Sequence, residues 1–187
     1  MTDIKLISKD DLTTFVKMEG IESWEQLIEI VKNLPFGRNS NRTDFKLVIK
    51  EQKGSCSSKH SFLKKIAELN NIPNIELVLG IYKMNKSNTP NIGNVLTDNS
   101  LDFIPEAHCY LKIHGKRTDV TTLQSNIENV EKDIIQEVEI QPEQVIEYKV
   151  EFHKIFLRNW ILENKLKMNF DELWGIREKC IENLSKQ

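Results

Sequence analysis

The feature that most constrains the fold is an amphipathic helical pattern followed directly by an almost continuous apolar run. Residues 56–70 repeat apolar side chains at helical spacing. Asn70 and Pro73 end this pattern, and "IELVLGIY" (75–82) follows, a run typical of a buried central strand. Two shorter strands, "AHCYLKI" (107–113) and "RTDVTTL" (117–123), are predicted on either side of "HGK" (114–116). We therefore expect an α+β fold with a helix packed on an antiparallel sheet.

Composition excludes several classes of protein. The chain has 187 residues, 39% of them hydrophobic, enough for one globular domain with its own core. The net charge of −2 predicts no nucleic-acid partner, and no run reaches the roughly 20 apolar residues of a membrane span. The acidic N-terminal stretch lacks the apolar run of a signal peptide. A cytoplasmic protein without a membrane partner is expected.

The three cysteines, Cys56, Cys109 and Cys180, are far apart and form no CxxC pair. This favours free thiols in a reducing compartment over a disulfide framework. Cys56 stands at the predicted helix start, where backbone N–H groups and the helix dipole favour the reactive thiolate. Gly54 would let the chain turn sharply into that helix. The alternative for Cys56 is a small side chain in the core, and a neighbouring base would decide between the two.

A predicted hairpin supplies a candidate base. In "AHCYLKIHGKRTDVT" the glycine of His114-Gly115 suits the positive φ of a two-residue turn. This turn makes His108 and Asp119 diagonal neighbours on one face, about 7–8 Å apart and within reach of each other's side chains. A carboxylate fixes the tautomer of an imidazole and stabilises its charged form, as a thiolate partner requires. The alternative is an exposed histidine among surface charges.

Zinc binding is a rival use of the same atoms, with Cys56, His60, His108 and Cys109 as ligands. His108 and Cys109 are adjacent on a predicted strand and so point to opposite faces. The closely spaced cysteine pairs of structural zinc sites are also missing from the sequence. We therefore expect no metal and no cofactor.

Together these motifs resemble the core of the transglutaminase-like superfamily, which has the papain-like cysteine-proteinase fold. That family has a Gly-x-Cys at a helix start, then Ile-Pro and a strand ending in Gly-aromatic, then His-x-aromatic and Asp-x-Thr strands. The matching stretches here are "GSC", "NIPNIELVLGIY", "HCY" and "DVT", in the same order. They span residues 54–121, less than half of the chain. No acidic loop of the calcium-dependent animal members is present, so no calcium is implied.

The resemblance implies a catalytic triad. Cys56 would be the nucleophile, His108 the general acid and base, and Asp119 the residue that orients His108. Tyr110 would pack beside the histidine, and the backbone N–H of Cys56 would donate to the oxyanion. Gln52 is a candidate second oxyanion donor, because papain-like relatives place a glutamine upstream of the cysteine.

Four more residues are candidate substrate contacts: Arg38, Asn39, His60 and Tyr82. Arg38 could clamp a substrate carboxylate bidentately, with an ordinary surface arginine as the alternative. Asn39 and Trp24 are also alternative oxyanion donors, although structural roles suit both. His60 lies one helical turn from Cys56 and could instead be a polar residue on the helix flank.

The expected function is acyl transfer through a cysteine. Cys56 would attack an amide or peptide bond of a peptide or protein substrate, and water or an amine would resolve the thioester. Bacterial members of the family favour hydrolysis. The alternative is a catalytically silent module that binds a peptide or protein partner through the loop 83–100 and the C-terminal helices.

One domain is expected over 1–187, with an N-terminal helical part (1–53), the core (54–123) and a mainly helical extension (124–187). The sequence leaves "DIIQEVEI" (133–140) open as helix or strand. In the extension, "YKVEFHKIFLRNWIL" (148–162) has an apolar stripe expected to pack on the domain's own core. A homodimer through the C-terminal helices is the alternative. His153 is expected on the helix surface.

Overall fold

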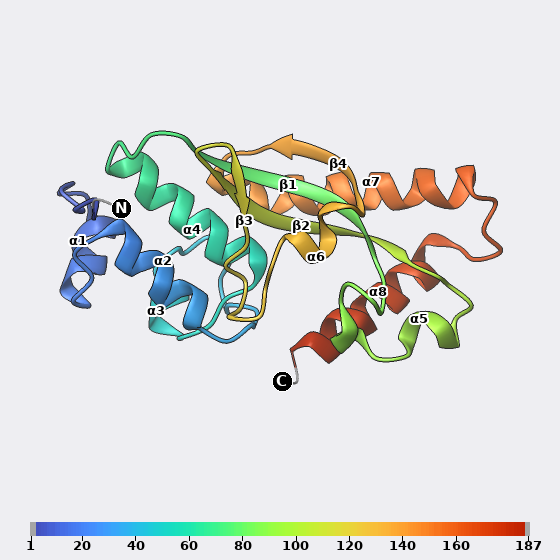
Figure 1. The fold of residues 1–187 in the computed structure, drawn as a ribbon. Helices are drawn as coiled ribbons and strands as arrows, with labels where there is room; N and C mark the ends of the chain where they lie inside the picture. The colour runs from blue at the N-terminus through green and yellow to red at the C-terminus, as the bar shows by residue number, and fades with distance from the viewer. Residues whose placement is uncertain (1–2, 186–187) are drawn as a thin grey trace.

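The computed structural model describes residues 3–185, which form an α+β fold of eight α-helices and one four-stranded antiparallel sheet (Figure 1). The strands are β1 (Ile75–Met84), β2 (Ile104–Ile113), β3 (Lys116–Thr118) and β4 (Ile134–Glu139), in the spatial order β3-β2-β1-β4. The helices are α1 (Asp11–Met18), α2 (Trp24–Asn33), α3 (Leu47–Lys50), α4 (Cys56–Leu69), α5 (Val95–Asp98), α6 (Glu128–Glu131), α7 (Glu147–Glu163) and α8 (Phe170–Leu184), with the 3-10 turns η1 (Pro90–Ile92) and η2 (Pro142–Val145).

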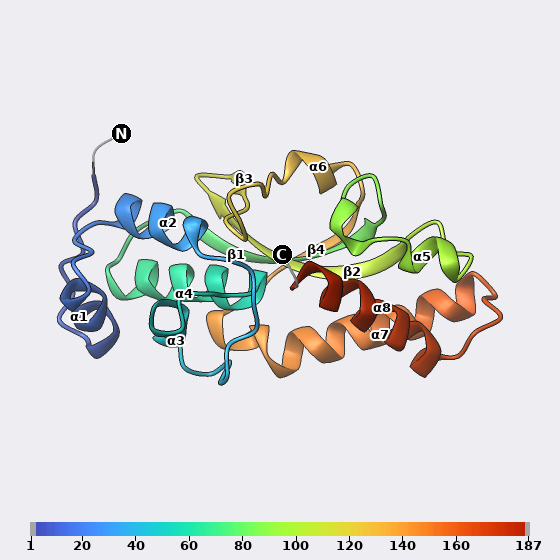
Figure 2. The same cartoon turned by 90° about the horizontal axis from the view of Figure 1, so that it is seen from below.

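Strand β1 is central and buried on both faces, which confirms the interpretation of its apolar run. Leu77 and Leu79 face a core shared with the N-terminal helices α1 to α4. Val78 and Tyr82 face a second core, built with η1, α5, α6 and α8. Figure 2 shows α4 and α7 on one side of the sheet and α6 on the other. Burial on both faces therefore removes the polar alternation of a half-exposed strand.

The β2–β3 hairpin forms with the predicted two-residue turn. His114 and Gly115 both have positive φ, 50° and 78°, and Ile113 pairs with Lys116. Positive φ at both central residues matches the right-handed twist of the flanking strands. This is the predicted register, and Asp119, directly after β3, lies within hydrogen-bond distance of His108.

Strand β3 is shorter than expected, because the chain leaves the sheet after Thr118 instead of continuing to Leu123. The Asp119 side chain accepts hydrogen bonds from the backbone N–H of Thr121 at 2.9 Å and from its hydroxyl at 2.6 Å. Such a local bond bends the backbone away from the ladder. The outer edge of β2 beside His108 is therefore not paired with β3.

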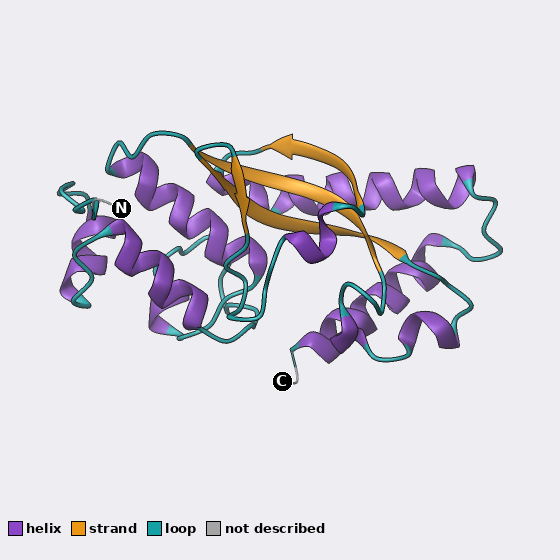
Figure 3. Ribbon diagram, viewed as in Figure 1, coloured by secondary structure: helices purple, strands orange, loops and turns teal. Residues whose placement is uncertain are grey.

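The C-terminal third also contributes to the sheet. The stretch that could be helix or strand contains β4, which pairs with β1 and places Val138 opposite Leu79 (Figure 3). The segment 83–100, expected to be a loop, contains the end of β1, η1 and α5. Pro90 stands at the first position of η1, where its fixed φ favours a helical turn.

Helix α7 packs mainly on the core, as the apolar stripe predicts. Leu157 is fully buried and Phe152 packs against the first core, whereas Ile155 is 55% exposed. The surface position expected for His153 is wrong. His153 is buried, and its Nε2 lies 2.8 Å from the Pro105 carbonyl, because α7 turns this face toward β2.

No helix within residues 3–185 is both long enough and apolar enough to cross a membrane.

Candidate active site

The start of α4 holds Cys56 at the first helical position. Ser55 is the N-cap, and Ser55 and Ser58 exchange hydrogen bonds in a capping box. A Cβ at Gly54 would lie 2.7 Å from the Cγ of Lys59, so the backbone approaches α4 too closely for any other residue. These local features fix the direction in which the thiol points.

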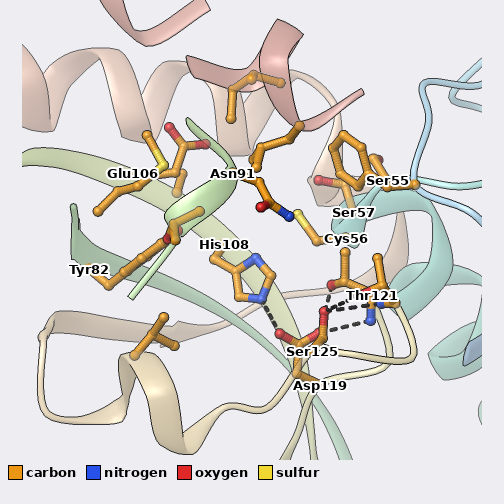
Figure 4. A pocket seen from close by; sticks show the side chains of 18 of the residues that line it. Ser55, Cys56, Ser57, Tyr82, Asn91, Glu106, His108, Asp119, Thr121 and Ser125 are labelled. Atoms are coloured by element: carbon orange, nitrogen blue, oxygen red, sulfur yellow. Dashed lines mark hydrogen bonds and ion pairs between the residues drawn. The ribbon is translucent and has the colours of Figure 1, made fainter. Parts of the chain in front are cut away.

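His108 lies between Asp119 and Cys56 (Figure 4). Its Nε2 is 2.8 Å from Oδ2 of Asp119, and the ring is close enough to the Cys56 thiol for each group to shift the pKa of the other. Thr121 holds the other carboxylate oxygen of Asp119. The fold thus brings together the three residues proposed as a triad from the sequence, in the order nucleophile, base and orienting carboxylate.

Electrostatics at these three residues favour an ion pair. Burial raises the pKa of the Cys56 thiol, but the neighbouring Lys149 and His108 cations lower it to about 6, with help from the backbone N–H of Cys109. Burial alone would lower the pKa of His108, but Asp119 and the thiolate raise it well above 6.5. Thiolate and imidazolium are therefore the favoured forms near neutral pH.

The ionised state of Asp119 completes this arrangement. Burial alone would raise the pKa of its carboxyl, but the charge and hydrogen bond of His108 hold that pKa well below its usual value. Asp119 is therefore a permanent anion that fixes the proton on His108 Nε2, which leaves Nδ1 for the exchange with sulfur.

Lys149 is a fourth charged residue at the site, and the sequence analysis missed it. It reaches in from α7, only 8% exposed, with Nζ 3.6 Å from Sγ of Cys56 and 2.7 Å from Oγ of Ser57. A signal was present in the sequence, because Lys149 and His153 stand four residues apart on the face that also carries Leu157. Polar residues on an otherwise buried helical stripe mark a buried polar contact.

A second missed cluster lies behind Lys149. Glu106 of β2 pairs with Arg177 of α8, whose Nε is 2.8 Å from Oε2, and His153 lies 4.0 Å from the same oxygen. Burial would raise the pKa of Glu106, but Arg177 and His153 lower it well below its usual value. Glu106 is therefore an anion on the same face of the strand as His108.

His60 is a structural residue with both ring nitrogens bonded to backbone. Val120 N–H donates to Nε2 at 2.9 Å, so the proton is on Nδ1, which donates to the Cys56 carbonyl at 2.7 Å. Burial lowers the pKa of His60 to about 4. The ring is therefore neutral, and its Nε2 at 3.6 Å from Asp119 makes no ion pair. This fully buried position does not bring His60 to a substrate.

Two of the proposed oxyanion and substrate residues have partners away from Cys56. Gln52 is exposed at a turn and its Nε2 donates to the Ile49 carbonyl at 2.6 Å. Asn39 is buried and donates to the carbonyls of Leu47 and Lys53. Both side chains brace the connection between α2 and α4.

Tyr110 packs beside the catalytic histidine candidate, as the resemblance implies. Its ring centroid is 6.0 Å from that of His108, and its hydroxyl donates to Glu137 of β4. A Cβ at Gly80 would lie 3.0 Å from the tyrosine hydroxyl, so the glycine of β1 makes room for this ring. Trp24, another oxyanion candidate, is a core residue that is 3% exposed.

A cavity of about 1030 Å³ opens over the thiol. Tyr82 lines it, with a hydroxyl 3.2 Å from that of Thr89, and Arg38 lines it while paired with Glu178 at 2.9 Å. Other lining residues include Phe36, Cys56, Asn91, Glu106, His108, Asp119, Lys149, Trp174 and Arg177. Figure 4 shows the Asn91 side chain directed toward Cys56. Apolar and charged side chains thus share the walls.

No group of three metal-ligating side chains occurs within residues 3–185. The four residues considered for zinc, Cys56, His60, His108 and Cys109, therefore contain no such group.

No family model, curated protein or solved structure matches this chain.

Proposed function

We propose that the chain is a cysteine-dependent amide hydrolase of the transglutaminase-like type, with a peptide or protein as its substrate. One observation carries the proposal: Cys56, His108 and Asp119 line one cavity in that order, with His108 hydrogen-bonded to Asp119 and beside the sulfur. The likeness to the transglutaminase-like and papain-like core supports the same assignment.

The reaction follows from the protonation states of the site. The Cys56 thiolate attacks the amide carbon and forms the S–C bond, and the backbone N–H at the start of α4 donates to the oxyanion. His108 gives its proton to the amine, which leaves as the C–N bond breaks. His108 then takes one proton from water, the water oxygen attacks the thioester carbon, and the S–C bond breaks to return the thiolate. The carboxylic acid formed releases its remaining proton to solvent and leaves as the carboxylate. Asp119 keeps its charge throughout.

The cavity suits an extended substrate better than a small one. Its volume of about 1030 Å³ lies at the top of the usual range for ligand sites, roughly 300–1,000 Å³. Phe36 and Trp174 offer apolar contacts, and Arg38 and Arg42 stand among the lining residues. A peptide segment with both apolar and acidic groups would use these walls fully.

The test is a screen of peptide amides with purified protein, followed by the Cys56→Ala variant. We expect ammonia or amine release with wild type, a thioester trapped on Cys56, and loss of at least about 10³-fold in rate in the variant. Cys180→Ala, in the second core, is the matched control. A labelled primary amine separates transamidation, which incorporates the label, from hydrolysis.

Equal binding of a peptide by wild type and Cys56→Ala, with no release from any amide, would contradict the proposal. It would favour a silent binding module instead.

A further inference from the structure

A lysine beside a cysteine thiolate is not part of a Cys-His-Asp triad, yet Lys149 contacts the nucleophile directly. Its Nζ is 3.6 Å from Sγ of Cys56, and Ser57 accepts a second hydrogen bond from it at 2.7 Å. The two residues are 93 positions apart, on α4 and α7. The contact is thus built by the packing of the two helices.

Lys149 stays charged despite its burial. Burial alone would lower the pKa of its ammonium, but the cysteine sulfurs and Glu106 raise that pKa above its usual value. Arg177 opposes this effect, although its own charge is paired with Glu106.

Other groups face the sulfur from the packed elements. From β2 come His108 and Cys109, the latter with a raised thiol pKa, so it stays protonated. Asp119 acts through His108, and His153 of α7, with a lowered pKa, is neutral. The two cations next to the Cys56 thiolate, among the described residues, are therefore His108 and Lys149.

We propose that Lys149 is a second, permanent counter-ion of the nucleophile, which keeps Cys56 a thiolate whether or not His108 carries a proton. The catalytic meaning of this inference rests on the proposed function. His108 must give up its proton to the leaving amine, so its charge alternates during the reaction. The ammonium of Lys149 transfers no proton, and its charge is constant.

The permanent charge has a consequence for the working range of the site. In a simple Cys-His pair the thiolate depends on the imidazolium, so the removal of His108 returns the thiol to ordinary acidity. With Lys149 in place the thiolate persists without His108. Lys149 therefore keeps Cys56 ionised, while Asp119 keeps the proton on His108, so the two pKa values are controlled by different residues.

The experiment measures the rate of Cys56 alkylation by iodoacetamide against pH, with the labelled peptide identified by mass spectrometry. In Lys149→Met the apparent pKa should rise by about 1–3 pH units, the usual effect of one charge at this distance. In His108→Ala it should stay below the free-thiol value of about 8.5, and the double variant should reach or exceed that value. Lys149→Arg, which retains the charge, should restore a low pKa. Lys65→Met removes a half-buried cation of the same helix that pairs with Glu143, and it should leave the alkylation pKa of Cys56 unchanged.

An unchanged alkylation pKa in Lys149→Met would overturn the inference, as would a return to free-thiol acidity in His108→Ala alone. If Lys149→Met fails to fold by circular dichroism, Lys149→Gln keeps a hydrogen bond to Ser57 without the charge and gives the same test. The readout needs no substrate. If no amide reacts, the proposed function is refuted, whereas the alkylation result for Lys149 still holds. If an amide reacts but the alkylation pKa of Lys149→Met is unchanged, only the inference about Lys149 is refuted.

Discussion

Two groups of polar side chains with little exposure lie on either side of Asp119, and similar residue types have different roles in them. On one side Lys59 and His60 of α4 bond to backbone atoms, and burial lowers the pKa of both, to about 8 and about 4. On the other side Lys149 and His108 face ionised side chains, and the pKa of both is raised. The partner, and not the degree of burial, decides whether a buried base keeps its charge.

Lys59 and His60 are structural residues, whereas Lys149 and His108 face the Cys56 sulfur. Lys59 donates to the carbonyls of Leu34 and Thr121, and His60 joins the start of α4 to the backbone of Val120. Together they hold the chain segment that carries Asp119. The opposite group then uses this fixed carboxylate to hold a charged histidine.

The largest effect should come from the reactive side. His108→Ala removes the proton donor and acceptor, so we expect the amide hydrolysis rate to fall by about 10²–10⁴-fold, the usual contribution of a general acid–base. Steady-state kinetics on the best substrate of the screen measures it. A matched His114→Ala change, at the exposed hairpin turn, should leave the rate unaltered. A fall in hydrolysis rate of less than tenfold in His108→Ala would show that His108 has no more catalytic importance than the structural pair Lys59 and His60.

On the scaffold side, Lys59→Met should lower stability and leave the chemistry of Cys56 in place. Two buried carbonyls lose their donor, and each costs about 1–3 kcal/mol. Urea unfolding measures the change, with Lys65→Met, at a half-buried lysine of the same helix, as control. Unaltered stability would show that the carbonyls find other partners.

The pH dependence of stability should show that His60 is neutral in the folded protein. Between pH 6.5 and about 4 the unfolded chain binds a proton at His60 that the folded chain does not, so stability falls as the pH drops through this window. The pKa difference corresponds to about 3 kcal/mol. His60→Leu should flatten this part of the profile, although it costs stability at pH 7. Urea unfolding at several pH values measures both, and an equally steep acid limb in His60→Leu would refute the neutral buried form.

The smallest effect tests how Lys149 acts. Ser57→Ala removes its hydrogen-bond acceptor but leaves the charge beside the sulfur. Because one net hydrogen bond is worth about 0.5–1.5 kcal/mol, the alkylation pKa of Cys56 should move by less than about 1 pH unit. The same pH profile of iodoacetamide labelling measures it. A change as large as that of Lys149→Met would mean that geometry and not charge is decisive.

Local patterns are enough to predict α4, β1 and the hairpin, because helical periodicity, the stop at Asn70 and Pro73 and the His114-Gly115 turn act over a few residues. The same hairpin register predicted that His108 and Asp119 share a face. Strand propensity does not predict the early end of β3. There the hydrogen bonds that Thr121 donates to the Asp119 carboxylate replace the backbone pairing of a longer strand.

The residues that the sequence did not reveal depend on packing between distant segments. The spacing of Lys149 and His153 marks a buried polar contact on α7, but nothing local shows that their partners lie on α4 and β2. Glu106 and Arg177 are 71 residues apart, and no spacing rule joins them. His60 was expected near the site, but its burial and its bond to Val120 are set by a loop 60 residues later.

Because α4 precedes α7 in the chain, the contact between them forms late during biosynthesis. Because a chain leaves the ribosome from its N-terminus, Cys56 emerges long before Lys149, and β1 waits for β4 to complete its second edge. Until the last third docks, the nascent thiol has neither its lysine nor a finished sheet around its histidine. The surroundings of the Cys56 thiol are therefore complete only after α7 has been synthesised and has packed against α4.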